Sequence, residues 1–202
     1  MPLSQDSSPY TLVICEKPDS AERIAEALSE KELNITKHGN IKIFTLKRSG
    51  RTYVICSASG HLYTISDPLP KRYVYPVFDV EWVPIHTVDL KRRYLSQRIG
   101  VIKKLAENAD VFINACDFDQ EGDTICFNIL KYACGEKQNM ALRAKFSTLT
   151  KTEVQEAFRS TVHGLGNGLA EAGRTRHIVD FIFGVNLSRA LSESYHKFNQ
   201  GY

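Results

Sequence analysis

Residues 111–123, VFINACDFDQEGD, contain the pattern that decides the fold. The first six form a short apolar run with β-branched and aromatic side chains, which predicts a buried strand. The acidic residues after it form a loop, and Gly122 permits a sharp turn out of that loop. Residues 124–134 then show the apolar spacing of a helix. A strand, a loop and a helix in this order are the repeating unit of a parallel α/β sheet.

The rest of the chain continues this alternation. Residues 10–15, YTLVIC, predict another buried strand, and Asp19 or Ser20 can cap the helix that follows it. Residues 41–46 and 53–56 predict a hairpin or strand pair around residues 47–51. The remaining periodic segments predict a strand at 142–146 and helices at 90–109, from 151 onward and at 169–194. The expected fold is therefore α/β, with a parallel sheet that has helices on both faces.

A turn with three glycines, HGLGNG at residues 163–168, is the clearest boundary in the chain. It predicts a first domain at residues 1–162 and the helical start of a second domain at 163–202. Residues 57–88 are rich in prolines and aromatic side chains, so we expect an insertion in the first domain around residues 37–88.

Composition places the chain among ordinary globular proteins. Of its 202 residues, 43% are hydrophobic and 24% are charged, which excludes collagen-like and wholly disordered chains. No apolar run approaches the roughly 20 residues of a membrane helix, and the first ten residues do not resemble a secretory signal. We therefore expect a cytoplasmic monomer that does not contact membranes. The five cysteines form no CxxC pair, so we expect free, buried thiols.

The net charge of +3 is too small to indicate a nucleic-acid partner by itself. Charge is nevertheless sorted along the chain, because residues 91–104 include six bases and no acid, and residues 107–123 include six acids and no base. This sorting fits a cation site beside an anion-binding surface. From charge alone, a solvated basic helix beside an acidic loop is the more common arrangement.

Acidic side chains follow two of the predicted strands, where open parallel sheets bind their ligands. In an extended loop, side-chain alternation would point Asp117, Asp119 and Glu121 to one side. Two carboxylates about 5 Å apart repel by about 3 kcal/mol at an effective dielectric of 20, so such a cluster favours a bound cation. Ligands that offer only oxygen select a hard ion, with Mg²⁺ as the candidate. Glu16, at the end of the other strand, could then act as a general acid or base on a phosphate ester.

Several segments resemble, in this order, the Toprim domain of type IA DNA topoisomerases. They are residues 11–20 (TLVICEKPDS), Gly60-His61, residues 115–123 (ACDFDQEGD) and residues 144–158 (AKFSTLTKTEVQEAF). Residues 172–191, AGRTRHIVDFIFGVNLSRAL, resemble the segment that follows Toprim in those enzymes. The Glu-Lys-Pro run is similar to the topoisomerase III and archaeal branch. The resemblance implies a Rossmann-like parallel sheet flanked by helices, followed by a helical segment of the next domain.

The resemblance also implies roles for individual residues. Glu16 would assist proton transfer at the scissile ester, and Lys17 would contact the scissile phosphate. Mg²⁺ would be held by Asp117, Asp119 and Glu121. The residues implied to contact DNA or to lie beside the site are His61, Arg176, Asp180 and Arg189. Gln120 and Asp123 depart from the family, which usually has Arg and Glu at these positions.

Family members cleave DNA with a tyrosine in a separate downstream domain, and none of the nine tyrosines here lies in a matching context. We therefore expect the metal-binding, acid–base half of an enzyme that breaks and rejoins a single DNA strand. Its partners would be single-stranded DNA, contacted at phosphates, and the remaining domains of the enzyme, without which this chain would be inactive.

Three other functions stay open. A Toprim nuclease would use the same acids, with water in place of tyrosine. A non-catalytic DNA-binding module would use the basic residues within 91–104. A phosphotransferase of another α/β fold would use Asp117 as its nucleophile and would leave Glu16 without a role.

Overall fold

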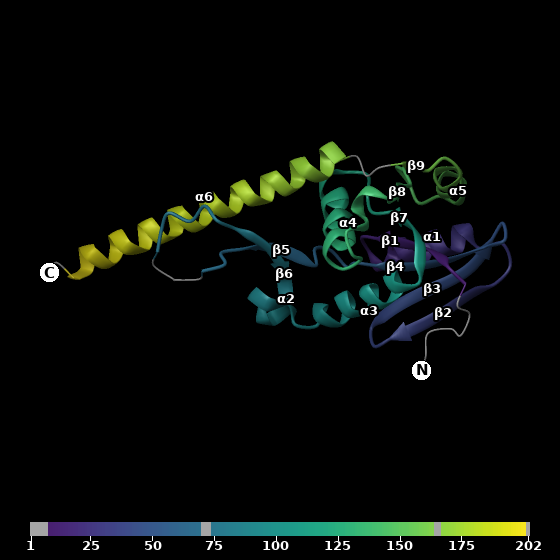
Figure 1. The fold of residues 1–202 in the computed structure, drawn as a ribbon, viewed down its shortest axis with the longest axis horizontal. Helices are drawn as coiled ribbons and strands as arrows, with labels where there is room; N and C mark the ends of the chain where they lie inside the picture. The colour runs from purple at the N-terminus through teal and green to yellow at the C-terminus, as the bar shows by residue number, and fades with distance from the viewer. Residues whose placement is uncertain (1–7, 70–73, 164–166, 201–202) are drawn as a thin grey trace.

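The computed structural model describes residues 8–69, 74–163 and 167–200 (Figure 1). Its centre is a seven-stranded sheet in the order β2-β3-β4-β1-β7-β8-β9. In that order the strands are Leu33–His38, Ile41–Arg48, Arg51–Ser57, Tyr10–Cys15, Ala109–Asn114, Leu142–Arg143 and Val162–His163.

Strand β1 lies in the middle of the sheet and pairs in parallel with β4 on one side and with β7 on the other. Its side chains alternate between two hydrophobic clusters, with Leu12 and Ile14 in one and Val13 and Cys15 in the other. Helices α1 (Pro18–Leu28) and α5 (Lys151–Arg159) supply the second cluster. Helices α3 (Leu95–Glu107) and α4 (Gln120–Tyr132) supply the first, so the predicted α/β architecture with both faces covered is confirmed.

The sheet is mixed rather than wholly parallel. Strands β3 and β4 form an antiparallel hairpin, and β2 and β9 also pair antiparallel with their neighbours. The turn of the hairpin is Ser49-Gly50, with φ of 49° and 79°. Two consecutive positive φ values match the twist of the flanking strands, so this short turn joins antiparallel strands. The predicted strand at 142–146 is shorter than expected, because β8 contains only Leu142 and Arg143.

The interval 37–88, expected to be an insertion, divides into two parts. Up to Ser57 it supplies β3 and β4 to the central sheet. After Ser57 the chain leaves that sheet and forms a separate two-stranded sheet of β5 (Tyr63–Ser66) and β6 (Glu81–Pro84). The short helices α2 (Ile85–Val88), η1 (Leu90–Arg92) and η2 (Lys137–Asn139) complete the elements.

The helix predicted at 90–109 is divided into η1 and α3. Its basic residues do not form one solvated face, because Arg98 is buried and donates from Nη1 to the Ser57 carbonyl at 2.8 Å. The expected helix at 169–194 is longer, since α6 runs from Asn167 to Gln200.

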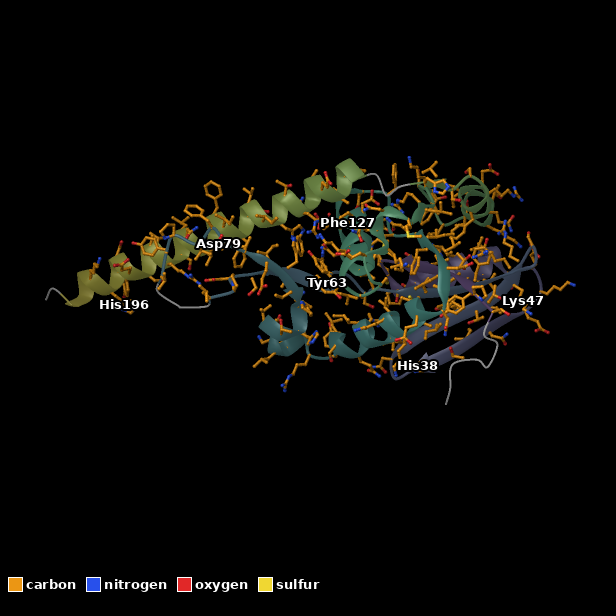
Figure 2. All side chains as sticks on the ribbon, in the orientation of Figure 1. His38, Lys47, Tyr63, Asp79, Phe127 and His196 are labelled. Atoms are coloured by element: carbon orange, nitrogen blue, oxygen red, sulfur yellow. The ribbon has the colours of Figure 1, made fainter. Side chains whose placement is uncertain are left out.

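Helix α6 begins against α4 and extends well beyond the central sheet (Figure 1). Gly173 permits the close approach, since a Cβ there would lie 2.0 Å from the Thr124 hydroxyl oxygen. Further along, the Asn186 side chain bonds both the N–H and the carbonyl of Val77, at 2.6 and 2.8 Å. Residues around Val77 therefore lie along the helix, and Figure 2 shows Asp79 beside its middle.

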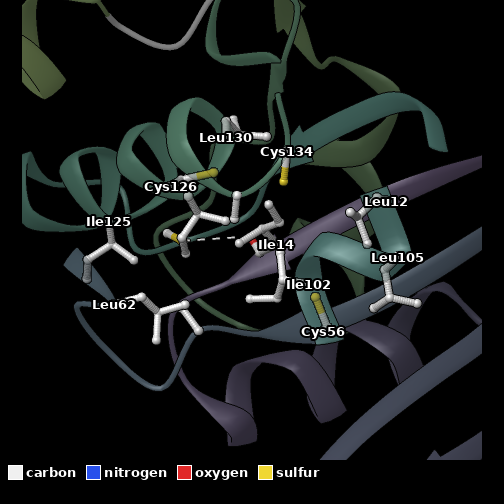
Figure 3. Close-up of a cluster of buried hydrophobic side chains, with 14 of the residues drawn as sticks. Leu12, Ile14, Cys56, Leu62, Ile102, Leu105, Ile125, Cys126, Leu130 and Cys134 are labelled. Atoms are coloured by element: carbon white, nitrogen blue, oxygen red, sulfur yellow. Dashed lines mark hydrogen bonds between the residues drawn. The ribbon is translucent and has the colours of Figure 1, made fainter. Parts of the chain in front are cut away.

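All five cysteines are free and buried, as expected. Figure 3 shows Cys56, Cys126 and Cys134 among the aliphatic side chains of the first cluster. Burial raises the pKa of Cys56 and of Cys134 to about 12, which makes both thiols unreactive near neutral pH. Within the described residues, no helix is long and apolar enough to cross a membrane.

Candidate active site at the strand ends

The neighbouring strands β1 and β7 end at the same edge of the sheet, and each is followed by an acid. Lys17 joins the two acids, since its Nζ lies 2.5 Å from Asp117 Oδ2 and 3.6 Å from Glu16 Oε1. Burial, and then the negative charge of Asp117, raise the pKa of Glu16, although Lys17 acts in the opposite direction. Asp119 also raises the pKa of Glu16, so the carboxylates of Glu16, Asp117 and Asp119 lie close enough to interact electrostatically. Glu16 therefore holds a proton more readily than an ordinary glutamate.

Helix α1 begins with Lys17 as its N-cap and Pro18 in its first turn, earlier than Asp19 or Ser20 would have placed the cap. Proline suits this position because its missing N–H would have no partner there. The Lys17 carbonyl accepts from the Ala21 N–H at 3.1 Å, so the backbone fixes the residue while the ammonium reaches the acids. The hydrogen bond to Asp117, followed by the charge of Glu16, raises the pKa of Lys17, which keeps it a cation.

Asp119 caps α4. Its Oδ1 accepts from the Gly122 N–H at 2.7 Å, so the helix begins at Gln120 and not near Thr124 as the apolar pattern predicted. Gly122 is required here because the first turn of the helix packs directly against the backbone of the acidic loop. A Cβ at Gly122 would lie 2.2 Å from the Asp117 carbonyl oxygen.

A buried arginine, Arg143, holds the backbone of the acidic loop through hydrogen bonds. Arg143 is fully buried, and its Nη1 and Nη2 atoms donate to the carbonyls of Cys116 and Asp117, both at 2.8 Å. Its Nε lies 3.1 Å from Asp123 Oδ1, out of line for a hydrogen bond, and Asn114 Nδ2 donates to the same oxygen at 2.8 Å. Burial raises the pKa of Asp123, and the charge of Arg143 opposes that rise. These contacts fix the backbone that carries Asp117.

Glu121 does not share an extended run with Asp117 and Asp119, because it lies in the first turn of α4. Its Oε2 is 2.9 Å from His61 Nε2 and 3.0 Å from His177 Nε2, and its Oε1 is 2.5 Å from Arg176 Nη2. Burial alone would raise the pKa of Glu121, but His177, His61 and Arg176 together lower it. The expectation that alternation points the three acids to one side is therefore wrong: helix geometry turns Glu121 toward α6 and the loop after β4.

The residues implied to contact DNA occupy two places. His61, Arg176 and Asp180 lie around Glu121, with Arg176 Nε 4.0 Å from Asp180 Oδ2 one helical turn later. Arg189 lies elsewhere, at the junction of α6 with the segment between β5 and β6. It donates to Asp67 Oδ2 at 2.9 Å and to the Val74 carbonyl at 2.6 Å.

Three important residues were missed from the sequence: Asn114, Arg143 and His177. Asn114 is the single polar residue in the apolar run VFINAC, and such a position signals a buried hydrogen-bonding role. Arg143 lies between apolar residues in ALRAKF, which is a weaker signal of the same kind because Lys145 is also there. His177 follows Arg176 directly, and nothing in its local sequence shows that α6 would bring it to Glu121.

Comparison with known proteins agrees with this geometry. The family model of the Toprim domain matches residues 11–149. The chain belongs to the Toprim domain family. Residues 11–149 extend from β1 through α4 and β8, and so include Glu16, Asp117, Asp119 and Glu121.

Similar proteins also match beyond the Toprim domain itself. DNA topoisomerase 1 of Methanothermobacter thermautotrophicus is 42% identical over 186 residues, which are 92% of this chain and 25% of the relative. DNA topoisomerase 3 of Staphylococcus epidermidis is 30% identical over 92% of this chain and 25% of the relative. The solved structure of full-length topoisomerase I from Thermotoga maritima covers 84% of this chain and 24% of that one, with a TM-score of 0.54 and 19% identity, and it shows the shared fold. The chain therefore spans about a quarter of the length of these relatives.

Proposed function

We propose that this chain is the metal-binding and acid–base part of a type IA DNA topoisomerase, which breaks and rejoins one strand of DNA. The observation that carries the proposal is the arrangement of Glu16, Lys17 and Asp117 at one edge of the sheet. The resemblance of the chain to proteins named DNA topoisomerase 1 and 3 gives this site its substrate class.

The acids fit a hard divalent cation. Asp117 and Asp119 offer only oxygen, as Mg²⁺ prefers, and Asp117 already pairs with one cation, the Lys17 ammonium at 2.5 Å. Mg²⁺ would be held by Asp117 and Asp119, and when bound it would offset negative charge on the DNA phosphate. Glu121 would have to give up its bonds to His61 and His177 before it could join them.

In the cleavage step, a tyrosine oxygen bonds to the backbone phosphorus, its proton passes to solvent, and the bond to the 3′ oxygen breaks. Glu16 donates its proton to that leaving oxygen. In rejoining, the 3′ hydroxyl gives its proton to Glu16 and attacks the phosphorus, and the phosphotyrosine bond breaks as the tyrosine oxygen takes a proton from solvent. A carboxyl with a raised pKa suits this exchange because it holds a proton more readily than an ordinary glutamate. Lys17 remains charged and can contact the phosphate.

The nucleophilic tyrosine would come from a part of the enzyme outside these 202 residues. Tyr10 and Tyr63 are unsuited to the role, since burial raises the pKa of each to about 12. The Tyr10 hydroxyl also donates to the Leu105 carbonyl at 2.6 Å. We therefore propose that this chain acts together with further domains, as a cytoplasmic monomer.

Single-stranded DNA would be bound through its phosphates. Lys17 and Arg176 are the exposed cations beside the site, with 58% and 52% of their side chains accessible. Arg189 is only 13% accessible and is paired with Asp67, so it would contribute less. Phosphate contacts make such binding strongly dependent on salt.

A chimera tests the proposal directly. This chain would replace the matched part of the Methanothermobacter thermautotrophicus enzyme, and relaxation of supercoiled DNA would be measured with Mg²⁺. We expect activity, and we expect Glu16→Gln to reduce it by about 100-fold or more, the usual scale of general acid–base catalysis. Glu22→Gln is the matched control, because Glu22 is an exposed acid paired with Lys42 at 2.9 Å. An active chimera that keeps its full rate with Glu16→Gln would refute the role of Glu16.

An assay of the chain alone distinguishes the proposed topoisomerase function from the nuclease alternative. Incubated with labelled single-stranded DNA and Mg²⁺, it should bind in a salt-sensitive way and form neither a covalent adduct nor cut products. Free fragments that disappear with Asp117→Asn would instead favour a nuclease.

A further inference from the structure

A second cluster of metal-ligating side chains lies next to the acidic loop. Among the described residues, His61, Glu121 and His177 form the one group of three such side chains with ligand atoms all within 4.8 Å of one another. Both imidazoles present Nε2 to the same oxygen, Glu121 Oε2, at 2.9 and 3.0 Å. The two rings also contact each other, with centroids 5.0 Å apart.

These separations are close to the distance between two neighbouring ligand atoms that bind one metal ion. Two ligand atoms that each lie about 2.1 Å from an ion, at right angles, are about 3.0 Å apart. An ion could therefore bind both imidazoles and Glu121 Oε2 after small side-chain movements. Arg176 contacts the other oxygen, Oε1, at 2.5 Å, and so leaves Oε2 as the ligand. Metal-bound carboxylates are commonly oriented by such a hydrogen bond on their second oxygen.

The donor set indicates which ions would bind. Two imidazoles and one carboxylate suit first-row transition metals, whereas Mg²⁺ and Ca²⁺ prefer oxygen alone. The five cysteines are buried elsewhere in the core and do not offer a competing thiolate site at the surface. His61 and His177 have 26% and 28% of their side chains accessible, so an ion could reach them from solvent.

We propose that His61, Glu121 and His177 form a binding site for a first-row transition dication, separate from the hard-cation site at Asp117 and Asp119. The three ligands come from the loop after β4, from α4 and from α6, so the ion would fasten together elements that are distant in the chain. This site uses none of Glu16, Lys17, Asp117 or Asp119, and it shares only Glu121 with the magnesium ligands that the family resemblance implies.

The alternative is that both imidazoles only donate hydrogen bonds to Glu121. In that case His61 and His177 each carry their proton on Nε2, and no ion is needed to satisfy the carboxylate. A metal site and a purely hydrogen-bonded cluster respond differently to added metal, so an experiment can distinguish them.

Metal titration of the chelator-treated chain tests the proposal, with Zn²⁺ followed by calorimetry and Co²⁺ by its visible absorption. We expect one ion per chain and a Co²⁺ spectrum without a thiolate charge-transfer band. His177→Gln, His61→Gln and Glu121→Gln should each weaken binding at least tenfold. His38→Gln should leave it unchanged, because His38 (labelled in Figure 2) lies in β2, the edge strand of the central sheet. The double variant Asp117→Asn, Asp119→Asn should also keep it, because those acids belong to the other site.

Two measurements make the result independent of whether a variant folds. Far-ultraviolet circular dichroism reports the fold of each variant. In the unaltered chain, a long-range ¹H–¹⁵N spectrum should show Zn²⁺ shifting the ring nitrogens of two of the six histidines. Shifts at other histidines, binding that survives both histidine variants, or no binding at millimolar Zn²⁺ would each overturn the proposal.

Discussion

Lys17 and Asp117 are 100 positions apart in the chain, yet the Lys17 ammonium lies 2.5 Å from Asp117 Oδ2. The parallel pairing of β1 with β7 produces this contact, because both residues follow strands that end at the same edge of the sheet. The same ammonium is 3.6 Å from Glu16 Oε1. One cation therefore serves two acids, and its position helps to determine how tightly Glu16 holds a proton.

The pKa of Glu16 should respond to both neighbours in opposite directions. Asp117→Asn removes a negative charge that raises this pKa and frees Lys17 to turn to Glu16, so the pKa should fall. Lys17→Met removes the main opposing charge, so the pKa should rise further. Carboxyl ¹³C NMR over a pH series measures both effects. A Glu16 pKa that is unchanged or higher with Asp117→Asn would contradict the shared environment.

The raised pKa of Glu16 also makes a prediction for stability. A carboxyl with a higher pKa in the folded state contributes stability below its unfolded value of 4.5, and this contribution is lost as pH rises through the folded pKa. Glutamine does not ionise, so the Glu16→Gln variant does not lose this stability as pH rises. The variant should therefore gain free energy of unfolding relative to the parent as pH rises from 4 to 7, as measured by urea denaturation. A constant difference across this range would show that Glu16 does not titrate abnormally.

The sequence predicted the main features of this site because they depend on short patterns. The runs YTLVIC and VFINAC are apolar and bounded by acids, which was enough to place Glu16 and Asp117 at strand ends. The direction of Glu121 was not predictable in the same way. It depends on whether the loop stays extended, and the Asp119 cap starts the helix four residues earlier than the apolar pattern suggested.

Contacts between distant segments account for most of what was missed. The Arg143 guanidinium reaches the carbonyl of Asp117, 26 positions earlier in the chain, and His177 reaches Glu121 from another helix. The antiparallel hairpin of β3 and β4 was predicted, but β2 (LNITKH) was missed, since it is mostly exposed and lacks the apolar run that identified the other strands.

Gly122 should tolerate no side chain. With a Cβ 2.2 Å from the Asp117 carbonyl oxygen, Gly122→Ala must displace either the helix start or the acidic loop, at a cost of about 1–3 kcal/mol. Gly100→Ala is the matched control, because Gly100 lies inside α3 with no atom within 4 Å of its added Cβ. There alanine should stabilise the helix by up to about 1 kcal/mol. Equal effects of the two substitutions in thermal or urea unfolding would show that Gly122 is not sterically constrained.

Arg143 should be among the most sensitive positions in the core. Arg143→Met leaves Asp123 buried without its cation, and breaking a buried pair in this way costs about 3–5 kcal/mol. Adding Asp123→Asn removes the uncompensated charge while keeping a polar partner for Asn114, so the double variant should recover part of the loss. Urea denaturation of the three variants gives the coupling directly. A double variant whose loss equals the sum of the two single losses would mean that Arg143 acts only through the carbonyls of the loop.

Asp119 combines two roles that substitutions can separate. Its charge belongs to the proposed cation site, and its Oδ1 caps α4 through the Gly122 N–H. Asp119→Asn keeps an oxygen in the capping position and removes the charge, whereas Asp119→Ala removes both. Alanine should therefore be less stable than asparagine by about 1 kcal/mol, the usual value of an N-cap. The Mg²⁺-induced rise in melting temperature should be reduced to the same extent in both variants, because each lacks the carboxylate. If asparagine instead keeps the full Mg²⁺ response, the charge of Asp119 takes no part in holding the cation, and Asp117 would have to hold it with other ligands.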